Sequence, residues 1–207
     1  MLDVVPMVFV VDDDVSVRES LELLITSAGW RPETFASAQE FLTRPPVVVP
    51  SCLVLDVTLP GLNGLDLQQR LSARTEMPIV FITGYGDVPT SVRAMKAGAA
   101  EFLMKPFKAD VLLGAIRTAL ERSQVTLNAE RHLRGLRDSY ASLTAREREV
   151  MALVVSGLLN KQAGGELGIS EITVKAHRGQ VMRKMKADSL AHLVKMATSL
   201  ETARTPR

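Results

Sequence analysis

The sequence has little cysteine and no long apolar run. The single cysteine among 207 residues, Cys52, lacks a partner for a disulfide bond and lies within an apolar segment, so we expect a buried core thiol in a reducing environment. No apolar stretch approaches the roughly 18 residues of a membrane-spanning helix, which predicts no membrane partner. The first residues carry no basic segment, so no secretory signal peptide is expected. Together these absences favour a cytoplasmic globular protein.

The chain also lacks a large net charge, because 25 Lys and Arg against 23 Asp and Glu give only +2. The charge is unevenly distributed, however. Through Arg122 there are 15 acidic and 11 basic residues, a formal charge of −4, whereas 8 acidic and 14 basic residues from Ser123 onward give +6. Such asymmetry is typical of an acidic domain joined to a basic domain that binds nucleic acid. Two unrelated solvated surfaces are the alternative explanation.

Short β-prone segments alternate with helix-length segments through the first half of the chain. The expected strands are residues 7–11, 31–35, 51–55, 78–82 and 101–104. The expected helices are residues 16–28, 37–44, 64–73, 88–97 and one that starts at 109. Five such units joined by short loops predict an α/β domain whose parallel sheet is covered by helices on both faces.

Polar residues directly follow four of the expected strands. They are Asp12-Asp13-Asp14 after the first, Asp56 after the third, Thr83 after the fourth and Lys105 after the fifth. Ligands of parallel sheets bind off the carboxyl ends of the strands, so these side chains are expected to meet at one edge. Carboxylates packed so closely repel one another unless a hard cation neutralises them, which predicts a site for Mg²⁺ (or Mn²⁺).

This group of side chains is suited to phosphoryl transfer. A carboxylate beside such a cation can attack phosphorus and form an acyl phosphate. Thr83 can donate a hydroxyl hydrogen bond to the transferred group, Lys105 can supply an ammonium charge, and Gly84 leaves room beside them. Each residue alone is more often a helix cap or a solvated side chain, but four matching strand ends favour a site.

The second half of the chain predicts helices only. Residues 109–140 are helix-prone and increasingly charged, which favours a helical spacer with a break near residues 123–128. Thr144 and Glu147 have the spacing of a capping box that opens a helix to about residue 156.

Two further helices have the arrangement of a helix-turn-helix motif. One is expected at residues 160–167 and the other from Ser170 to Met185, with a short turn between them and a last helix at 189–200. The second helix of such a motif enters the major groove of DNA. Val174 and Val181 of that helix are expected to face the core.

Cationic side chains run along this second helix, namely Lys175, Arg178, Arg183 and Lys184. Base reading needs exposed side chains in the early turns, so Lys175, Ala176 and Gly179 are expected to face the groove floor. The residues expected at the phosphate backbone are Lys161, Thr173 and Arg183. A solvated basic face is the alternative for any single lysine. His177 is either a buried polar link or a phosphate contact, since metal binding lacks neighbouring ligands.

The first 122 residues resemble the receiver domain of two-component response regulators. The matching motifs are Val11-Asp12-Asp13-Asp14, Asp56-x-x-x-Pro60-x-x-x-Gly64, Ile82-Thr83-Gly84 and Lys105-Pro106-Phe107. The resemblance implies a five-stranded, flavodoxin-like sheet in the order 2-1-3-4-5 and Asp56 as the phosphoacceptor. It further implies metal ligands, which are Asp12, Asp13, Asp56 and the backbone carbonyl of Thr58. Thr83 and Phe102 would be the switch residues, Lys105 the phosphate-binding lysine, and the peptide before Pro106 cis.

Residues 143–193 resemble the DNA-binding domain of the LuxR/FixJ/NarL group. The matching segments are Leu143–Val150, Gly157–Gln162, Leu167–Ser170 and Thr173–Arg178. Joined to a receiver, they resemble FixJ-type transcriptional regulators over nearly the whole chain. The implied domains are 1–122, a linker at 123–140 and 141–207. The implied partners are a sensor histidine kinase, promoter DNA, a second copy of the chain after phosphorylation, and RNA polymerase.

Two glycines depart from that family pattern. Ala163-Gly164 replaces a larger pair, typically Ile-Ala, and Gly179 replaces a longer polar residue in the recognition helix. A helix-interior glycine costs about 0.5–1 kcal/mol relative to alanine. We therefore expect Gly164→Ala to raise the melting temperature of this domain, and a drop to show a non-helical backbone.

Three functions are compatible with these patterns. The first is a phosphorylation-controlled, sequence-specific DNA-binding transcriptional regulator, expected to be an activator. The second is an aspartate-nucleophile phosphatase of the haloacid-dehalogenase type, but such enzymes need an acid two residues after the nucleophile, where Thr58 stands. The third is constitutive DNA binding beside a vestigial receiver, against which the intact acidic set argues. The sequence therefore favours the regulator, without an enzymatic activity of its own.

Overall fold

The computed structural model describes residues 5–85 and 88–202, and the chain divides into two units, Met1–Asn128 and Ala129–Arg207. No helix in the described ranges is both long and apolar enough to cross a membrane. The domain boundaries expected from the sequence remain predictions.

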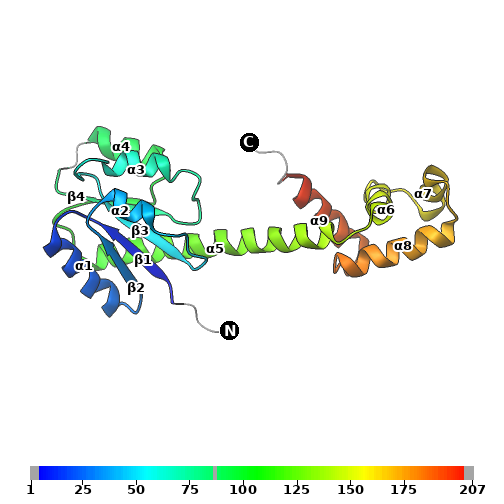
Figure 1. The fold of residues 1–207 in the computed structure, drawn as a ribbon, viewed down its shortest axis with the longest axis horizontal. Helices are drawn as coiled ribbons and strands as arrows, with labels where there is room; N and C mark the ends of the chain where they lie inside the picture. The colour runs from blue at the N-terminus through cyan, green and yellow to red at the C-terminus, as the bar shows by residue number, and fades with distance from the viewer. Residues whose placement is uncertain (1–4, 86–87, 203–207) are drawn as a thin grey trace. The chain divides into compact units, whose positions relative to one another are not determined.

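The first unit is a parallel α/β sheet with helices on both faces (Figure 1). Its strands are β1 (Met7–Val11), β2 (Arg31–Phe35), β3 (Ser51–Asp56), β4 (Ile79–Thr83) and β5 (Glu101–Met104). Its helices are α1 (Val15–Ser27), α2 (Ala38–Thr43), α3 (Gly64–Arg70), α4 (Val88–Lys96) and the first part of α5 (Ala109–Ala141). The five strands pair in parallel in the order β2-β1-β3-β4-β5, which confirms the expected fold class.

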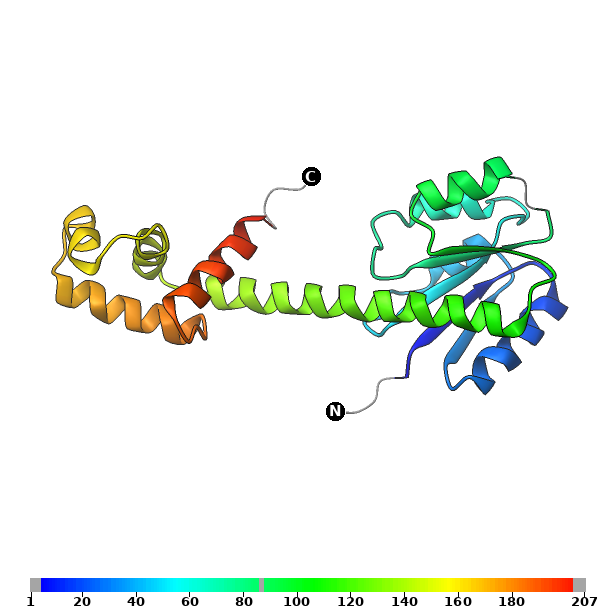
Figure 2. The same cartoon turned by 180° about the vertical axis from the view of Figure 1, so that it is seen from behind.

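Alternate residues of each central strand enter different cores. Phe9 of β1 packs with α2, α3 and α4, whereas Val10 packs with α1 and α5. Both views show this division of the helices between the faces (Figures 1 and 2). All residues of β1, β3 and β4 are buried, as expected for a sheet with two covered faces. Cys52 is fully buried there, as predicted, and burial raises its thiol pKa well above the usual range.

Side chains at the helix starts explain the local boundaries. Asp14 Oδ1 accepts a hydrogen bond from the backbone N–H of Ser16 at 2.8 Å and caps α1. Ser37 Oγ accepts from the N–H of Glu40 at 3.2 Å and caps α2. The Glu40 carboxylate accepts from the N–H of Ala36 at 2.8 Å. In a regular capping box it would accept from the N–H of the cap residue itself, which is Ser37.

The break expected near residues 123–128 is absent, because α5 is helical throughout. This segment contains neither glycine nor proline to interrupt the helix. Ser123 does not compete with the helical backbone either. Its buried hydroxyl donates to the Glu76 carbonyl at 2.5 Å and accepts from the Ser51 N–H at 2.9 Å. The polar residue therefore fixes α5 to the start of β3.

Through residue 202, where its described residues end, the second unit is built from helices joined by short turns. After the end of α5 they are α6 (Ala145–Val155), α7 (Asn160–Leu167), α8 (Glu171–Lys184) and α9 (Leu190–Thr202). The predicted capping box is present, because the Thr144 hydroxyl accepts from the Glu147 N–H and the Glu147 carboxylate accepts from the Thr144 N–H. Helices α7 and α8 form the expected helix-turn-helix pair, and Val174 and Val181 of α8 are buried as predicted.

The packing around Gly164 argues against the expected stabilisation by alanine, although the backbone there is helical. A Cβ at Gly164 would lie 2.8 Å from the carbonyl oxygen of Ile169, in the turn between α7 and α8. A Cβ at the neighbouring Gly165 would meet no atom within 4 Å. Close packing of α7 against the turn, rather than helix propensity, therefore decides the effect of alanine at position 164.

We now expect Gly164→Ala to lower the unfolding free energy of the second unit by about 1–2 kcal/mol, since the crowding outweighs the gain in propensity. Gly165→Ala is the matched control and should raise it by up to about 1 kcal/mol. Chemical denaturation of the full-length variants, followed by circular dichroism, measures both. A stabilised Gly164→Ala variant would contradict this packing argument.

Candidate functional site

Three carboxylates meet at the carboxyl ends of β1 and β3. Each of Asp12, Asp13 and Asp56 offers an oxygen, and these atoms lie within 4.8 Å of one another. Asp12 and Asp56 are buried, whereas Asp13 is exposed. The parallel pairing of the two strands brings their ends together, as the sequence predicted.

Lys105 lies between the two buried carboxylates. Its Nζ donates to Asp12 Oδ2 at 2.6 Å and to Asp56 Oδ2 at 2.8 Å. The three carboxylates and one ammonium leave a formal charge of −2, which a divalent cation would neutralise. The carboxylate oxygens are also the ligand type that Mg²⁺ prefers. The side chains present therefore fit a hard divalent ion. The Lys105–Pro106 peptide is cis, as the family resemblance implied.

Burial and the neighbouring charges shift the pKa values of Asp12 and Lys105 in opposite directions. Burial raises the pKa of Asp12 above its ordinary value, and the hydrogen bonds from Lys105 and Asp14 only partly offset it. Burial also lowers the pKa of Lys105, but the hydrogen bonds and charges of Asp12 and Asp56 outweigh it, so the net pKa is raised. Lys105 therefore stays protonated at neutral pH.

The loop after β3 holds Asp56 through the backbone. The Thr58 N–H donates to Asp56 Oδ1 at 2.9 Å, and the Gly64 N–H donates to the Val57 carbonyl at 3.0 Å. A Cβ at Gly64 would lie 2.3 Å from the Asp56 carbonyl oxygen, so only glycine fits the start of α3. The motif spacing revealed Gly64 in the sequence, but its packing role needed the structure.

Thr83 and Phe102 occupy neighbouring strands. The buried Thr83 hydroxyl donates to the Tyr85 carbonyl at 3.3 Å and accepts from the Tyr85 N–H at 3.2 Å, and among the described residues these are its hydrogen bonds. The half-buried Phe102 ring lies 6.1 Å from the Phe81 ring, centroid to centroid. Thr83 and Phe102 therefore lie in the same sheet region, each with a local partner.

Arg18 is a residue of this edge that sequence reasoning missed. Its guanidinium donates to the backbone carbonyl of Asp12 at 2.7 Å. It lies one turn after the Asp14 cap of α1, and no sequence signal distinguished it from the other basic residues.

The exposed face of α8 carries the predicted base-reading residues. Lys175, Ala176 and Gly179 are exposed, as are the three side chains expected at phosphates, namely Lys161, Thr173 and Arg183. Val174 and Val181 hold the opposite face in the core. The helix is thus oriented with its small and cationic side chains outward.

Two cationic side chains of α8 form hydrogen bonds to other helices or loops of the second unit. Arg178 is half-buried and donates to the Asn160 side-chain carbonyl at 3.1 Å. Lys184 donates to the Glu147 carboxylate at 2.6 Å and to the Ser142 carbonyl at 3.2 Å. The hydrogen bond from Lys184, followed by that from the Thr144 backbone, lowers the pKa of Glu147. Lys184 therefore ties α8 to the cap of α6, which its sequence position had not indicated.

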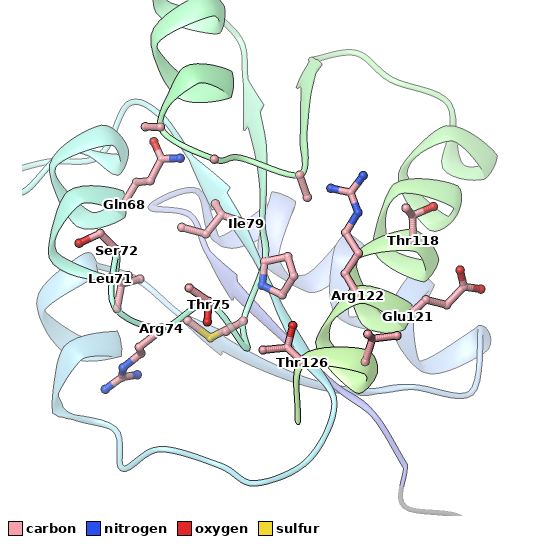
Figure 3. Close-up of a pocket in the computed structure, with 16 residues that line it drawn as sticks. Gln68, Leu71, Ser72, Arg74, Thr75, Ile79, Thr118, Glu121, Arg122 and Thr126 are labelled. Carbon is pink, nitrogen blue, oxygen red and sulfur yellow. The ribbon is translucent and has the colours of Figure 1, made fainter. Parts of the chain in front are cut away.

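A separate cavity of about 740 Å³ lies at the opposite, amino end of β4. Figure 3 shows Gln68, Leu71 and Ser72 on one side of it and Thr118 and Arg122 of α5 on the other. Its lining residues include neither Lys105 nor any of Asp12, Asp13 and Asp56. The cavity is therefore distinct from the candidate site.

Comparison with known proteins identifies the class. The family model for the response regulator receiver domain matches residues 8–117, and that for the luxR family of bacterial regulatory proteins matches residues 141–197. The chain belongs to the two-component response regulators that join a receiver to a LuxR-type DNA-binding domain. Such a pair of domains implies a histidine kinase and DNA as partners.

Particular relatives extend over nearly the whole chain. It is 50% identical to Nodulation protein W of Bradyrhizobium diazoefficiens over 194 residues, covering 93% of this chain and 86% of that protein. It is 41% identical to Transcriptional regulatory protein FixJ of the same species over 191 residues, covering 92% and 93%. The solved structure of the response regulator StyR is 48% identical, with a TM-score of 0.86 and coverage of 94% and 99%.

Proposed function

We propose that Asp56 accepts a phosphoryl group from a sensor histidine kinase and that this modification controls promoter binding by α8. The observation that carries the proposal is the Asp56 carboxylate itself. Its side chain is 9% exposed, held by the Thr58 N–H on one oxygen and by Lys105 on the other. Asp13 is more exposed but has no such contact to Lys105.

The cluster supports a divalent cation as cofactor. Mg²⁺ (or Mn²⁺) would be held by Asp12, Asp13, Asp56 and the backbone carbonyl of Thr58. When bound, it would neutralise charge on the phosphoryl oxygens and on the carboxylates around them.

The bonds that form and break in the transfer step lie between the Asp56 carboxylate and the phosphoryl donor. An Asp56 oxygen attacks phosphorus, a P–O bond forms, and the P–N bond to the kinase histidine breaks, with the electron pair leaving on the imidazole. Lys105 is already 2.8 Å from Asp56 and protonated, so its ammonium can turn to the new phosphoryl oxygens. A bound divalent cation would neutralise the Asp12 carboxylate once the ammonium leaves it.

Thr83 and Phe102 are the proposed switch. Phosphorylation adds about −1.5 to −2 charges at Asp56. The Thr83 hydroxyl exchanges its bonds to the Tyr85 backbone for a phosphoryl oxygen, and Phe102 turns into the space that Thr83 leaves. Because Phe102 is only half-buried beside Phe81, its reorientation would disturb fewer contacts than that of a fully buried ring.

The phosphorylated chain would act as a homodimer on DNA. Two α8 helices would read half-sites about one helical turn apart. Lys175, Ala176 and Gly179 would face bases, whereas Lys161, Thr173, Arg178 and Arg183 would contact the phosphate backbone or support those that do. Binding beside a promoter would recruit RNA polymerase. The chain would then act as a transcriptional activator. The proposed location is the cytoplasm, because promoter DNA and RNA polymerase are found there.

Turnover as a phosphatase is the weaker candidate. The residue two positions after Asp56 is Thr58, whose exposed side chain cannot serve as the general acid that such enzymes need. We therefore propose a regulator without enzymatic turnover of its own.

Footprinting tests the proposal. Full-length protein with Mg²⁺ and acetyl phosphate should protect specific genomic sites at concentrations at least about tenfold lower than protein without donor, since phosphorylation biases a two-state equilibrium. The gain should vanish in Asp56→Asn. Equal protection with and without donor in the native chain would contradict phosphorylation control but leave DNA binding intact.

A further inference from the structure

Ile172 is a large apolar side chain directed into solvent at the start of the recognition helix. Its exposed fraction is 82%, and in the described part of the chain only Tyr85 among large apolar residues is more exposed. It is the second residue of α8, directly after Glu171. The turn before it is well held, because the Ser170 hydroxyl accepts from the Thr173 N–H and bonds the Thr173 hydroxyl at 2.8 Å. The exposure is therefore a property of an ordered helix start.

Helical geometry places Ile172 on the same stripe as the predicted base readers. At about 100° per residue, positions 175, 176 and 179 lie within roughly 60° of position 172. The buried Val181 lies about 180° away, and Val174 about 160° away. Ile172 thus stands at the centre of the outward face, directed away from the core of its own unit.

Two of the other stripe positions carry small residues, so Ile172 is the large apolar side chain of this stripe. Ala176 is exposed, and a Cβ at Gly179 would meet no protein atom within 4 Å, so packing within the fold does not require glycine there. Small side chains at both positions let the α8 backbone approach a groove floor closely. A close approach brings an isoleucine in the first turn to the base edges, where recognition helices make their contacts.

We propose that Ile172 is a specificity-determining residue that contacts the C5-methyl group of a thymine in the major groove. The thymine methyl is the apolar feature of that groove, and apolar side chains recognise it. Lys175, one turn further along the stripe, supplies the cation that a DNA surface needs. The inference rests on the proposed function, because it requires α8 to bind DNA.

The experiment uses the full-length chain with Mg²⁺ and acetyl phosphate. Sites are selected from random DNA duplexes with the native protein and with Ile172→Ser. In the best native site each thymine is then replaced singly by uracil, which removes only the methyl group. We expect one uracil replacement per half-site to weaken native binding about 3- to 5-fold, the loss of one buried carbon. Ile172→Ser should be insensitive to that replacement and should lose the preference for thymine there.

Leu159→Ser is the matched control. Leu159 is also an exposed apolar residue, at 70%, but it lies before α7 and off the α8 stripe. It should keep the uracil sensitivity of the native chain, even if its overall affinity changes. Ile172→Val, which retains a branched apolar side chain, should keep it as well.

The outcomes separate the two proposals. If no sequence is enriched with the native chain, the proposed DNA function fails and the inference falls with it. If a site is enriched but every uracil replacement affects the native protein and Ile172→Ser alike, only the inference is overturned. A variant with unchanged base preference but altered response to acetyl phosphate would also overturn it and would assign Ile172 to a protein contact instead.

Discussion

Replacement of Asp56 by asparagine is expected to abolish phosphoryl incorporation. The amide is a poor nucleophile, and it removes one of the three carboxylates that would hold the cation. Intact-mass spectrometry after incubation with Mg²⁺ and acetyl phosphate should show one phosphoryl increment on the native chain and none on Asp56→Asn. Transfer should fall by at least about a thousandfold, the scale on which a lost nucleophile affects such reactions.

Asp14→Asn is the matched control for that experiment. Asp14 belongs to the same acidic run, but it is exposed, lies outside the carboxylate cluster and caps α1. Asparagine caps helices about as well as aspartate, so this variant should fold and accept the phosphoryl group normally. Phosphorylation of Asp56→Asn at the native rate would refute the acceptor assignment, as would loss of transfer in the control alone.

A second large effect is expected from Gly64→Ala. The new methyl would lie 2.3 Å from the Asp56 carbonyl oxygen and 3.0 Å from the Cα of Val57, and both neighbours are backbone atoms that cannot turn aside. To relieve this steric clash, either α3 or the end of β3 must move. We expect a loss of about 3 kcal/mol of unfolding free energy. This corresponds to a melting temperature lower by about 10 °C. Because the displaced segment carries Asp56, the remaining folded protein should also accept the phosphoryl group more slowly.

Gly114→Ala controls for the loss of a glycine. Gly114 lies inside α5, where a Cβ would meet nothing within 4 Å, so alanine should stabilise the first unit by up to about 1 kcal/mol. Calorimetry of the full-length chains compares the two variants. If Gly64→Ala melts with the native protein, the close approach at β3 does not constrain position 64.

The contrast between the glycines shows where sequence reasoning stops. Gly164 and Gly165 are adjacent in one helix, and helix propensity assigns them the same cost. Only the position of the Ile169 carbonyl makes one of them necessary. The same applies to Lys184, whose partner Glu147 is 37 residues away in the chain, and to Ser123, whose hydroxyl contacts the backbone of two distant segments.

The sequence by itself determined the alternation of strands and helices, the four polar strand ends and the helix-turn-helix. These features depend on local periodicity and helix caps, which neighbouring residues in the chain encode. Only the tertiary structure decided which oxygens Lys105 contacts, that α5 continues through residues 123–128, and that Ile172 projects into solvent. Those outcomes depend on atoms brought together by packing between segments distant in the sequence, and local patterns carry no record of such contacts.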